Sequence, residues 1–304
     1  MKTPTITRSG FVSILGRPNA GKSTLLNALV GDKLAIVSEK PQTTRTTIQG
    51  VATYAGVQIV FIDTPGIHKS TTLFNRRMME TVRTALADRD VLLYVADAAA
   101  PFSAEDSEAL SALKDLATPT LLVLNKVDRV QDKRQLLPLM EQYKSARDFT
   151  EYLPVSAATG EGLDRLRDAI SSRLPEGPAF FPPDHLTDQP ERFLAAELIR
   201  EQLLRQTRQE VPHAAAVIID RWEEKPNITH IAATVYVERA GQKTIVIGAA
   251  GANLKKIGTL ARHAIEKMLG RKVFLELFVK VQKDWREDTN FLNAIDWRSM
   301  RGGE

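Results

Sequence analysis

The residues best suited to chemistry form three short motifs in a fixed order. They are Gly16-Arg17-Pro18-Asn19-Ala20-Gly21-Lys22-Ser23, Asp63-Thr64-Pro65-Gly66 and Asn125-Lys126-Val127-Asp128. The first has the GxxxxGK[ST] pattern, in which glycines let backbone N–H groups wrap phosphates, lysine adds a positive charge and a serine hydroxyl can bind Mg²⁺. A carboxylate at the end of the following strand can hold the same ion through water. Together the motifs predict a site for a nucleotide and Mg²⁺.

Each position in the first two motifs has a predicted role. Lys22 stabilises phosphate charge, and Ser23 and Asp63 are metal ligands. The Gly66 backbone N–H meets the γ-phosphate. The rest of the predicted phosphate contacts come from residues adjacent to these four: Gly16, Arg17, Pro18, Asn19, Ala20, Gly21, Thr24, Thr64, Pro65 and Ile67.

The third motif predicts that the base is guanine. Guanine presents N1–H and an exocyclic amine side by side, and the Asp128 carboxylate can accept both hydrogen bonds. Adenine would leave this carboxylate unpaired, which favours GTP over ATP. Asn125 is expected to brace neighbouring loops, with Val127 beside it and the Lys126 stem over the base. The backbone N–H groups of Ser156 and Ala157 are expected to meet the guanine O6.

These motifs need a sheet that brings strand ends together. Apolar runs ending near Leu15, Ile62, Asp97, Leu124 and Val155 alternate with helical stretches, as in a mostly parallel sheet with helices on both faces. Five of the fifteen prolines then fall between positions 175 and 190, a density that no helix tolerates. The predicted domains are residues 1–174 and 191–284, joined by an extended, semi-rigid linker over 175–190 and followed by a tail over 285–304.

The second half has a different order: helix, strand, strand, helix, strand. Between its second and third strands lies Ile247-Gly248-Ala249-Ala250-Gly251-Ala252-Asn253-Leu254, which resembles the Gly-x-x-Gly loop of an α+β type II KH domain. That loop clamps single-stranded nucleic acid, and its glycines allow close approach of the sugar-phosphate backbone. Here the two middle positions are alanines, where lysine or arginine is common, so Lys255 and Lys256 are expected to supply charge.

Charge supports a nucleic-acid partner for this half. Residues 241–283 hold nine Lys and Arg against two acidic residues, and the formal excess of +4 for the whole chain falls within residues 191–304. Such an excess predicts binding that weakens as salt rises. A merely solvated basic face is the alternative. Trp285 could stack on a base, although a tryptophan at the end of a strand is more often part of the core.

Residues 10–173 resemble the translation-factor class of small GTPases. The segment Pro41-Gln42-Thr43-Thr44-Arg45 resembles the first switch of the Era subfamily, in which a threonine hydroxyl completes the Mg²⁺ shell. This implies a metal-binding and catalytic role for Thr44, with Thr43 second. A polar loop without this role is the alternative.

Hydrolysis must differ from the Ras pattern, because Ile67 stands where a glutamine would orient water. Slow turnover is therefore expected. The Pro-Asn-x-Gly-Lys loop is similar to those that bind K⁺ beside the phosphates, which implies a catalytic role for Asn19 and K⁺ as a further cofactor. His68 as a general base is less favoured than a solvated loop histidine.

A GTPase domain followed by a KH domain resembles the bacterial Era family over nearly the whole chain. The resemblance implies binding near the 3′ end of 16S rRNA, assistance in assembling the small ribosomal subunit, and GTP favouring the RNA-competent form. A monomer with peripheral contact to the inner membrane is expected.

Three other functions stay open at this stage. The chief alternative is a GTPase that signals to a protein or membrane through a KH fold used for docking. A P-loop kinase or ATPase and a catalytically silent RNA-binding scaffold are the others. The absence of cysteine excludes disulfides and thiolate metal sites. Without a signal-peptide core or an apolar run near twenty residues, a cytoplasmic location is expected.

Overall fold

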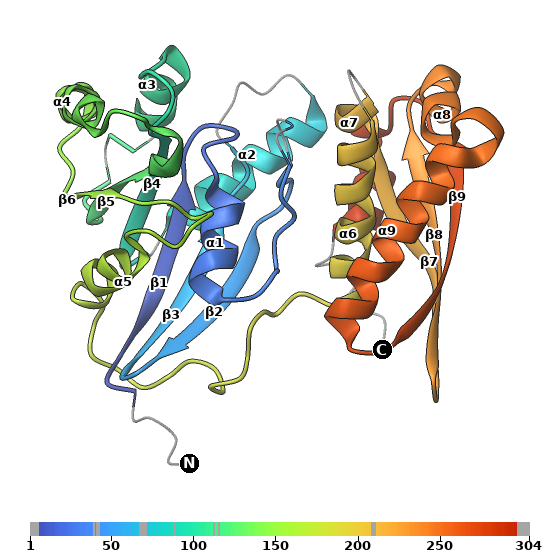
Figure 1. Cartoon of the computed structure of the whole chain (residues 1–304), viewed down its shortest axis with the longest axis horizontal. Coiled ribbons are helices and arrows are strands. Elements are labelled where there is room, and N and C mark those ends of the chain that lie inside the picture. The colour runs from blue at the N-terminus through green and yellow to red at the C-terminus, as the bar shows by residue number, and fades with distance from the viewer. Residues whose placement is uncertain are drawn as a thin grey trace. The chain divides into compact units, whose positions relative to one another are not determined.

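The computed structural model describes residues 6–38, 40, 43–66, 72–87, 89–111, 113–114, 116–207 and 211–296 of the 304-residue chain. The chain divides into two compact units (Figure 1). The first consists of Met1–Ala35, Thr44–Thr71 and Asn75–Asp188, and the second of Ile36–Thr43, Thr72–Phe74 and Gln189–Glu304. Each unit has its own sheet.

The first unit contains a six-stranded sheet in the order β2-β3-β1-β4-β5-β6. Its strands are β1 (Arg8–Leu15), β2 (Ile48–Tyr54), β3 (Val57–Asp63), β4 (Val91–Asp97), β5 (Thr120–Asn125) and β6 (Glu151–Pro154). All neighbouring pairs are parallel except β2 and β3, which are antiparallel. The predicted mostly parallel sheet is confirmed. The edge strand β2 was not among the predicted strands.

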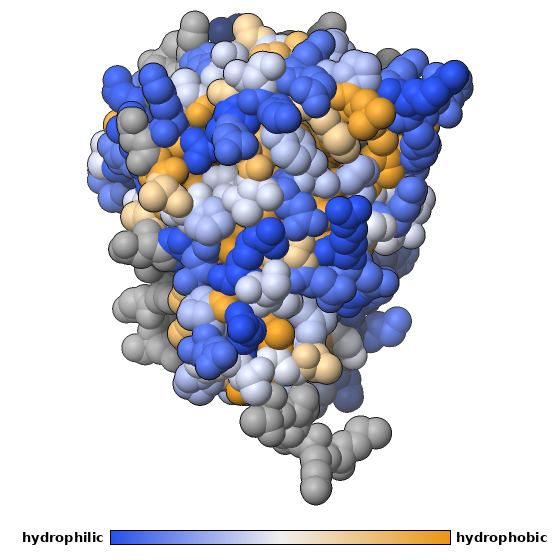
Figure 2. Space-filling view, turned by 90° about the vertical axis from the view of Figure 1, so that its left-hand side faces the viewer, coloured by the Kyte–Doolittle hydropathy of each residue, from blue (hydrophilic) through white to orange (hydrophobic). Residues whose placement is uncertain are grey.

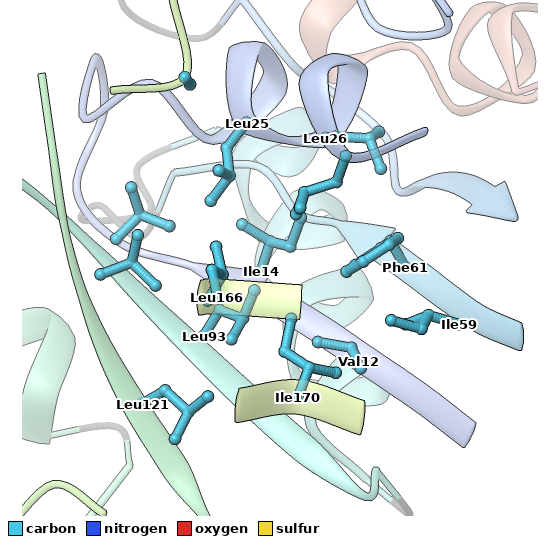
Figure 3. Packing of buried hydrophobic residues seen from close by; sticks show 14 of the residues in the cluster. Val12, Ile14, Leu25, Leu26, Ile59, Phe61, Leu93, Leu121, Leu166 and Ile170 are labelled. Atoms are coloured by element: carbon cyan, nitrogen blue, oxygen red, sulfur yellow. The ribbon is translucent and has the colours of Figure 1, made fainter. Parts of the chain in front are cut away.

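Helices cover both faces of this sheet. They are α1 (Lys22–Val30), α2 (Leu73–Leu86), α3 (Ala104–Ser111), α4 (Leu136–Ala146) and α5 (Leu163–Ser171), with short 3₁₀ turns η1 (Val127–Arg129) and η2 (Lys133–Gln135). Leucines of α1 and Leu166 and Ile170 of α5 pack on one face of the strands (Figure 3). Residues of α2, α3 and α4 pack on the opposite face. This double burial explains why the strands are nearly continuous apolar runs.

The sheet register places the motifs next to one another. Asp63 at the end of β3 pairs with Ile14 of β1, and Asn125 at the end of β5 pairs with Asp97 at the end of β4. Parallel strands put all their carboxyl ends at one edge, which is where ligands bind in open α/β sheets. The three motifs therefore meet at this edge.

The proline-rich segment lies along the first unit. The Ser9 hydroxyl donates to the Pro178 carbonyl over 2.6 Å, and the Gln58 amide oxygen accepts the backbone N–H groups of Phe180 and Phe181. The Val51 N–H donates to the Leu186 carbonyl over 2.8 Å. These bonds fix residues that the proline content alone suggested to be a spacer.

The second unit has a three-stranded sheet in the order β7-β8-β9. Its elements are α6 (Glu191–Gln206), α7 (Val211–Ala214), β7 (Ala216–Lys225), β8 (Ile228–Val237), α8 (Ala240–Ile247), η3 (Ala249–Gly251), α9 (Ala252–Leu269), β9 (Lys272–Val281), η4 (Trp285–Glu287) and α10 (Thr289–Ile295). β7 and β8 are antiparallel, whereas β8 and β9 are parallel and joined through α8 and α9. Apolar residues of α6 and α9 form a core with one face of the sheet.

The residues after position 284 continue this unit. Trp285 is fully buried, its indole N–H donates to the Ala214 carbonyl over 2.9 Å, and its ring packs on Phe291 of α10. A buried indole cannot stack on a nucleic-acid base. The alternative of a core residue is therefore the correct one for Trp285.

The outer surface is mainly polar on the side where Figure 1 draws α4 and α5. Figure 2 shows hydrophilic side chains over most of that face, with hydrophobic residues in small separate patches. Among the described residues, no helix combines the length and the apolar character that a membrane span needs.

We expect Trp285→Phe to lower the free energy of unfolding by about 2 kcal/mol, because the Ala214 carbonyl loses its donor and the smaller ring leaves space. Urea denaturation followed by circular dichroism measures this. Trp222→Phe is the matched control, since its indole N–H bonds the exposed Glu224 carboxylate. Equal destabilisation by the two variants would contradict the assignment of Trp285 to the core.

Candidate functional site

The first motif forms a tight loop between β1 and α1. Gly16 has φ +143° and Gly21 has φ +94°. A Cβ on Gly16 would lie 2.2 Å from the Val95 carbonyl oxygen, and one on Gly21 would lie 2.3 Å from the Asn125 amide nitrogen. Only glycine fits these two positions. No side chain in the described part of the chain caps the start of α1, and uncapped N–H groups at a helix start suit an anion.

Lys22 is buried at the centre of this loop. Its ammonium donates to the carbonyl oxygens of Gly16 and Arg17, both over 3.0 Å. Burial lowers the pKa of Lys22 to about 8, while the charge of Asp63 opposes this shift. The Lys22 ammonium is thus held in place by the backbone of the loop that precedes it.

Three oxygen-bearing side chains from distant segments meet beside Lys22. The Ser23 hydroxyl donates to an Asp63 oxygen over 2.7 Å and lies 2.7 Å from the Thr44 hydroxyl. Burial raises the pKa of Asp63 to about 6, against the effect of Lys22 and the hydrogen bonds from Ser23 and Thr44. The other Asp63 oxygen is buried with no hydrogen-bond partner in the described chain. An all-oxygen set with an unsatisfied carboxylate oxygen fits a hard cation such as Mg²⁺.

The structure distinguishes Thr44 from Thr43, the two threonines considered as metal ligands. The Thr44 hydroxyl lies 3.5 Å from Asp63, within the oxygen cluster. The Thr43 hydroxyl instead donates to the Lys40 carbonyl over 2.6 Å. The structure therefore brings Thr44, not Thr43, to Ser23 and Asp63.

The second motif packs directly on the first. A Cβ on Gly66 would come within 2.9 Å of the Pro18 ring, and the buried Thr64 hydroxyl donates to the Ile14 carbonyl over 2.8 Å. Pro65 is also buried. Ile67 and His68 lie outside the described residues.

Asn125 joins three loops. Its amide nitrogen donates to the Ala20 carbonyl over 3.1 Å, and its amide oxygen accepts the N–H groups of Lys126 and Ala157. The predicted bracing by Asn125 is confirmed. Val127, next along the motif, is buried in the core.

Asp128 is exposed at the mouth of the site. The buried Ser156 hydroxyl donates to one of its carboxylate oxygens over 2.6 Å, which fixes the orientation of the carboxylate. The Ser156 N–H donates to the Glu161 carbonyl and the Ala157 N–H to Asn125. Both backbone donors predicted for guanine O6 therefore already bond within the protein, so an incoming oxygen would share them.

Two acidic residues of this site were missed by the sequence analysis. Asp97 pairs with the Lys126 ammonium over 2.6 Å, and the same ammonium donates to the Asn19 carbonyl. Asp106 is fully buried, accepts hydrogen bonds from Ser103 and Tyr94, and lies 3.7 Å from the Arg17 guanidinium. Ser103 and Asp106 bond each other at the start of α3, whereas the contact with Arg17 depends on tertiary structure. The only feature of the sequence that pointed to Asp97 was its position at the end of a predicted strand.

The glycine loop of the second unit lies between α8 and α9. Gly248 has φ +73°, Gly251 has φ +79° and Ala250, although not glycine, has φ +48°. Ala249 and Ala250 are exposed, as are Lys255 and Lys256 in the first two turns of α9. The structure thus brings all six predicted RNA-contacting residues to one end of α9.

Comparison with known proteins decides the family. Residues 11–126 match the family described as 50S ribosome-binding GTPase, and residues 210–286 match the KH domain family. GTPase Era of Geobacter metallireducens is 49% identical over 95% of this chain and 98% of its own length. The chain belongs to the GTPase Era family. Era of Syntrophus aciditrophicus is 48% identical, with 95% of each chain covered.

Solved Era structures agree over both units. Aquifex aeolicus Era bound to GDP and AlF₄⁻ matches with a TM-score of 0.92 and 39% identity, over 95% of this chain and 99% of that one. Era in complex with MgGDPNP and nucleotides 1506–1542 of 16S ribosomal RNA matches with a TM-score of 0.93 and 39% identity, over 96% and 99%.

Family membership confirms the predicted activity. The chain binds guanine nucleotide and is a GTPase that hydrolyses GTP. The GTPase domain and the following KH domain are also confirmed. A kinase, an ATPase or a catalytically silent scaffold does not agree with this membership.

We expect Asp97→Asn to weaken GTP and GDP binding equally, by roughly fivefold, because a partly buried ion pair that fixes Lys126 is worth about 1 kcal/mol. Fluorescent guanine-nucleotide titration measures this. Asp164→Asn is the control, since that carboxylate is 87% exposed in its own ion pair. Unchanged affinity in Asp97→Asn, or an equal loss in both variants, would contradict a role for Asp97 in the site.

Proposed function

We propose that this chain is a GTP-dependent switch that binds 16S rRNA near its 3′ end and assists assembly of the small ribosomal subunit. The observation that carries the proposal is the match of 96% of the chain, with both units included, to Era in complex with MgGDPNP and nucleotides 1506–1542 of 16S ribosomal RNA. A partial match limited to the GTPase unit would have left the role of the KH unit without support.

The nucleotide contacts come from four loops at one edge of the first sheet. Backbone N–H groups of the loop from Gly16 to Gly21 and the Lys22 ammonium hold the phosphates. Asp128, oriented by Ser156, accepts both guanine donors, while the Lys126 stem lies over the base. The Ala157 N–H already donates to the Asn125 amide oxygen, and the guanine O6 shares this donor.

Mg²⁺ is the proposed metal, held by Ser23, Thr44 and Asp63. Their mutual contacts and the unpartnered Asp63 oxygen support this assignment. When bound, Mg²⁺ neutralises charge on the phosphate oxygens. Because Thr44 comes from a separate segment, it is the ligand best placed to depend on the presence of the γ-phosphate.

Catalysis by these residues is chiefly electrostatic. Lys22 stabilises charge that develops on the transferred phosphate. Ile67 has no polar group to orient water, and we propose that K⁺ held at Asn19 contributes positive charge beside the phosphates in place of an arginine. Asn19 has φ +63° and is exposed at the site, and its carbonyl is already bound by Lys126.

The KH unit is the proposed RNA-binding part. Gly248, Ala249, Ala250 and Gly251 present backbone rather than charge, while Lys255 and Lys256 lie exposed on the following helix. Backbone approach with flanking lysines suits a single-stranded sugar-phosphate chain. We further propose a cytoplasmic monomer with peripheral contact to the inner membrane.

We expect a labelled RNA from the 3′ end of 16S rRNA to bind more tightly with a non-hydrolysable GTP analogue than with GDP, and Gly251→Asp to abolish binding. Gly251 has φ +79°, so aspartate strains the loop and places a carboxylate against phosphate. Fluorescence anisotropy measures both effects.

Gly270→Asp is a matched control for this experiment. Gly270 also has a left-handed φ, +65°, and open space around its Cβ, but it ends α9 at the opposite terminus. Its variant should bind RNA as the native chain does. Absence of RNA binding in either nucleotide state would favour docking to a protein or membrane and leave only the GTPase activity.

We expect GTP turnover to be several-fold faster in KCl than in NaCl at equal ionic strength, because K⁺ beside Asn19 adds positive charge near the phosphates. Asn19→Gly should remove the difference while keeping the left-handed backbone. Phosphate release measures turnover, and GDP affinity serves as the control. Equal rates in the two salts for the native chain would exclude the K⁺ site.

A further inference from the structure

The loop from Gly248 to Gly251 has an unusual backbone and no charge of its own. Gly248 combines φ +73° with ψ 177°, and Ala250 adopts φ +48° and ψ 28°. A left-handed backbone is unfavourable for alanine, so surrounding contacts must maintain it. One bond inside the loop, from the Gly251 N–H to the Gly248 carbonyl over 3.2 Å, is long and weak.

Asn253 provides side-chain hydrogen bonds between the loop's two flanking helices. It lies in the first turn of α9, and its amide nitrogen reaches back to the last turn of α8, donating to the carbonyls of Ile245 over 3.1 Å and Val246 over 3.3 Å. The last four carbonyls of a helix have no intrahelical partner, and one side chain here serves two of them.

The contact also limits what the loop can accommodate. A Cβ on Gly248 would lie 2.7 Å from the Asn253 Cβ and 3.0 Å from its backbone nitrogen. Gly248 and Asn253 are therefore packed against each other across the loop. Val246 in the last turn of α8 is fully buried, and Leu254 in the first turn of α9 packs on the same core. These apolar contacts hold the two helix ends, and the Asn253 side chain connects the two ends.

We propose that Asn253 is the positioning residue of the RNA-binding loop, holding its backbone in the conformation that receives the sugar-phosphate chain. The inference rests on the proposed RNA-binding function. The loop has alanines at both middle positions and therefore no charge to attract phosphate. Its rigidity compensates, because the entropy cost of ordering the loop is met on folding and not on binding. Asn253 itself contributes no positive charge, so its effect on affinity is independent of salt.

The test compares RNA affinities over a range of KCl concentrations. Asn253→Leu removes both donors with little change in volume, and it should weaken binding of the 16S 3′-end RNA about fivefold, the effect of two neutral hydrogen bonds at the low end of their range. The slope of log affinity against log salt should stay unchanged. Lys255→Gln should weaken binding and reduce that slope by about 0.7, the value for one phosphate contact on a single strand.

Thr259→Val is the matched control, because the Thr259 hydroxyl donates to the Lys255 carbonyl on the exposed side of the same helix. It removes a side-chain donor from α9 without touching the loop and should leave RNA affinity unchanged. Thermal unfolding of each variant establishes that it is folded. Asn253→Ala, with a smaller side chain, replaces Asn253→Leu if the latter does not fold.

The outcomes separate this inference from the proposed function. Native chain that fails to bind the RNA would overturn the proposed function. Native binding with Asn253→Leu within twofold of it would overturn the role of Asn253, as would a loss accompanied by a smaller salt slope. Amide hydrogen exchange provides a second measurement: faster exchange confined to residues 246–254 in the variant is expected, and exchange spread evenly over α9 would contradict a local positioning role.

Discussion

The structure depends on close packing of the loop from Gly16 to Gly21, which leaves no room for side chains at its two glycines. At Gly16 an added Cβ would lie 2.2 Å from the Val95 carbonyl, and at Gly21 it would lie 2.3 Å from Asn125. Both neighbours belong to the strand ends that form the nucleotide site. The loop is therefore packed between its own sheet and the third motif, and a side chain at Gly16 would meet the backbone of β4. The glycines couple phosphate binding to the position of the third motif.

This tight arrangement has an electrostatic cost, and the polar contacts offset it. Burial disfavours the charged forms of Lys22 and Asp63, and it moves their pKa values toward each other, to about 8 and about 6. Two carbonyls hold the ammonium, and Ser23 and Thr44 bond one carboxylate oxygen, yet the second oxygen is left without a partner in the described chain. Buried polar groups are rarely left unsatisfied unless a ligand completes them. The second Asp63 oxygen thus lacks a partner that a divalent cation would supply.

Motif spacing predicted the strands that carry the three motifs and their meeting at one edge of the sheet, because hydrophobic runs and glycine patterns are local signals. The edge strand β2 was missed although it forms a short local hairpin with β3. The ion pair between Asp97 and Lys126 and the contact between Asp106 and Arg17 were not predictable, because both depend on residues far apart in the sequence meeting after the sheet has formed. The same reason applies to Trp285. Its position at the end of β9 is visible in the sequence, whereas its partner Ala214 lies before β7 and only the folded unit brings the two together.

The loop from Gly16 to Gly21 and the loop from Gly248 to Gly251 are similar in backbone but differ in charge. Each precedes a helix whose first residues lack a side-chain cap, and each has glycines in left-handed conformation at its two ends. The nucleotide loop adds Lys22, which suits a compact, highly charged triphosphate. The loop from Gly248 to Gly251 adds no charge and is held by Asn253 from outside. A sugar-phosphate chain has one charge per nucleotide and can move along a charged surface. In the proposed RNA complex, a rigid, uncharged loop favours one position of that chain, and the lysines of α9 supply attraction without fixing the position.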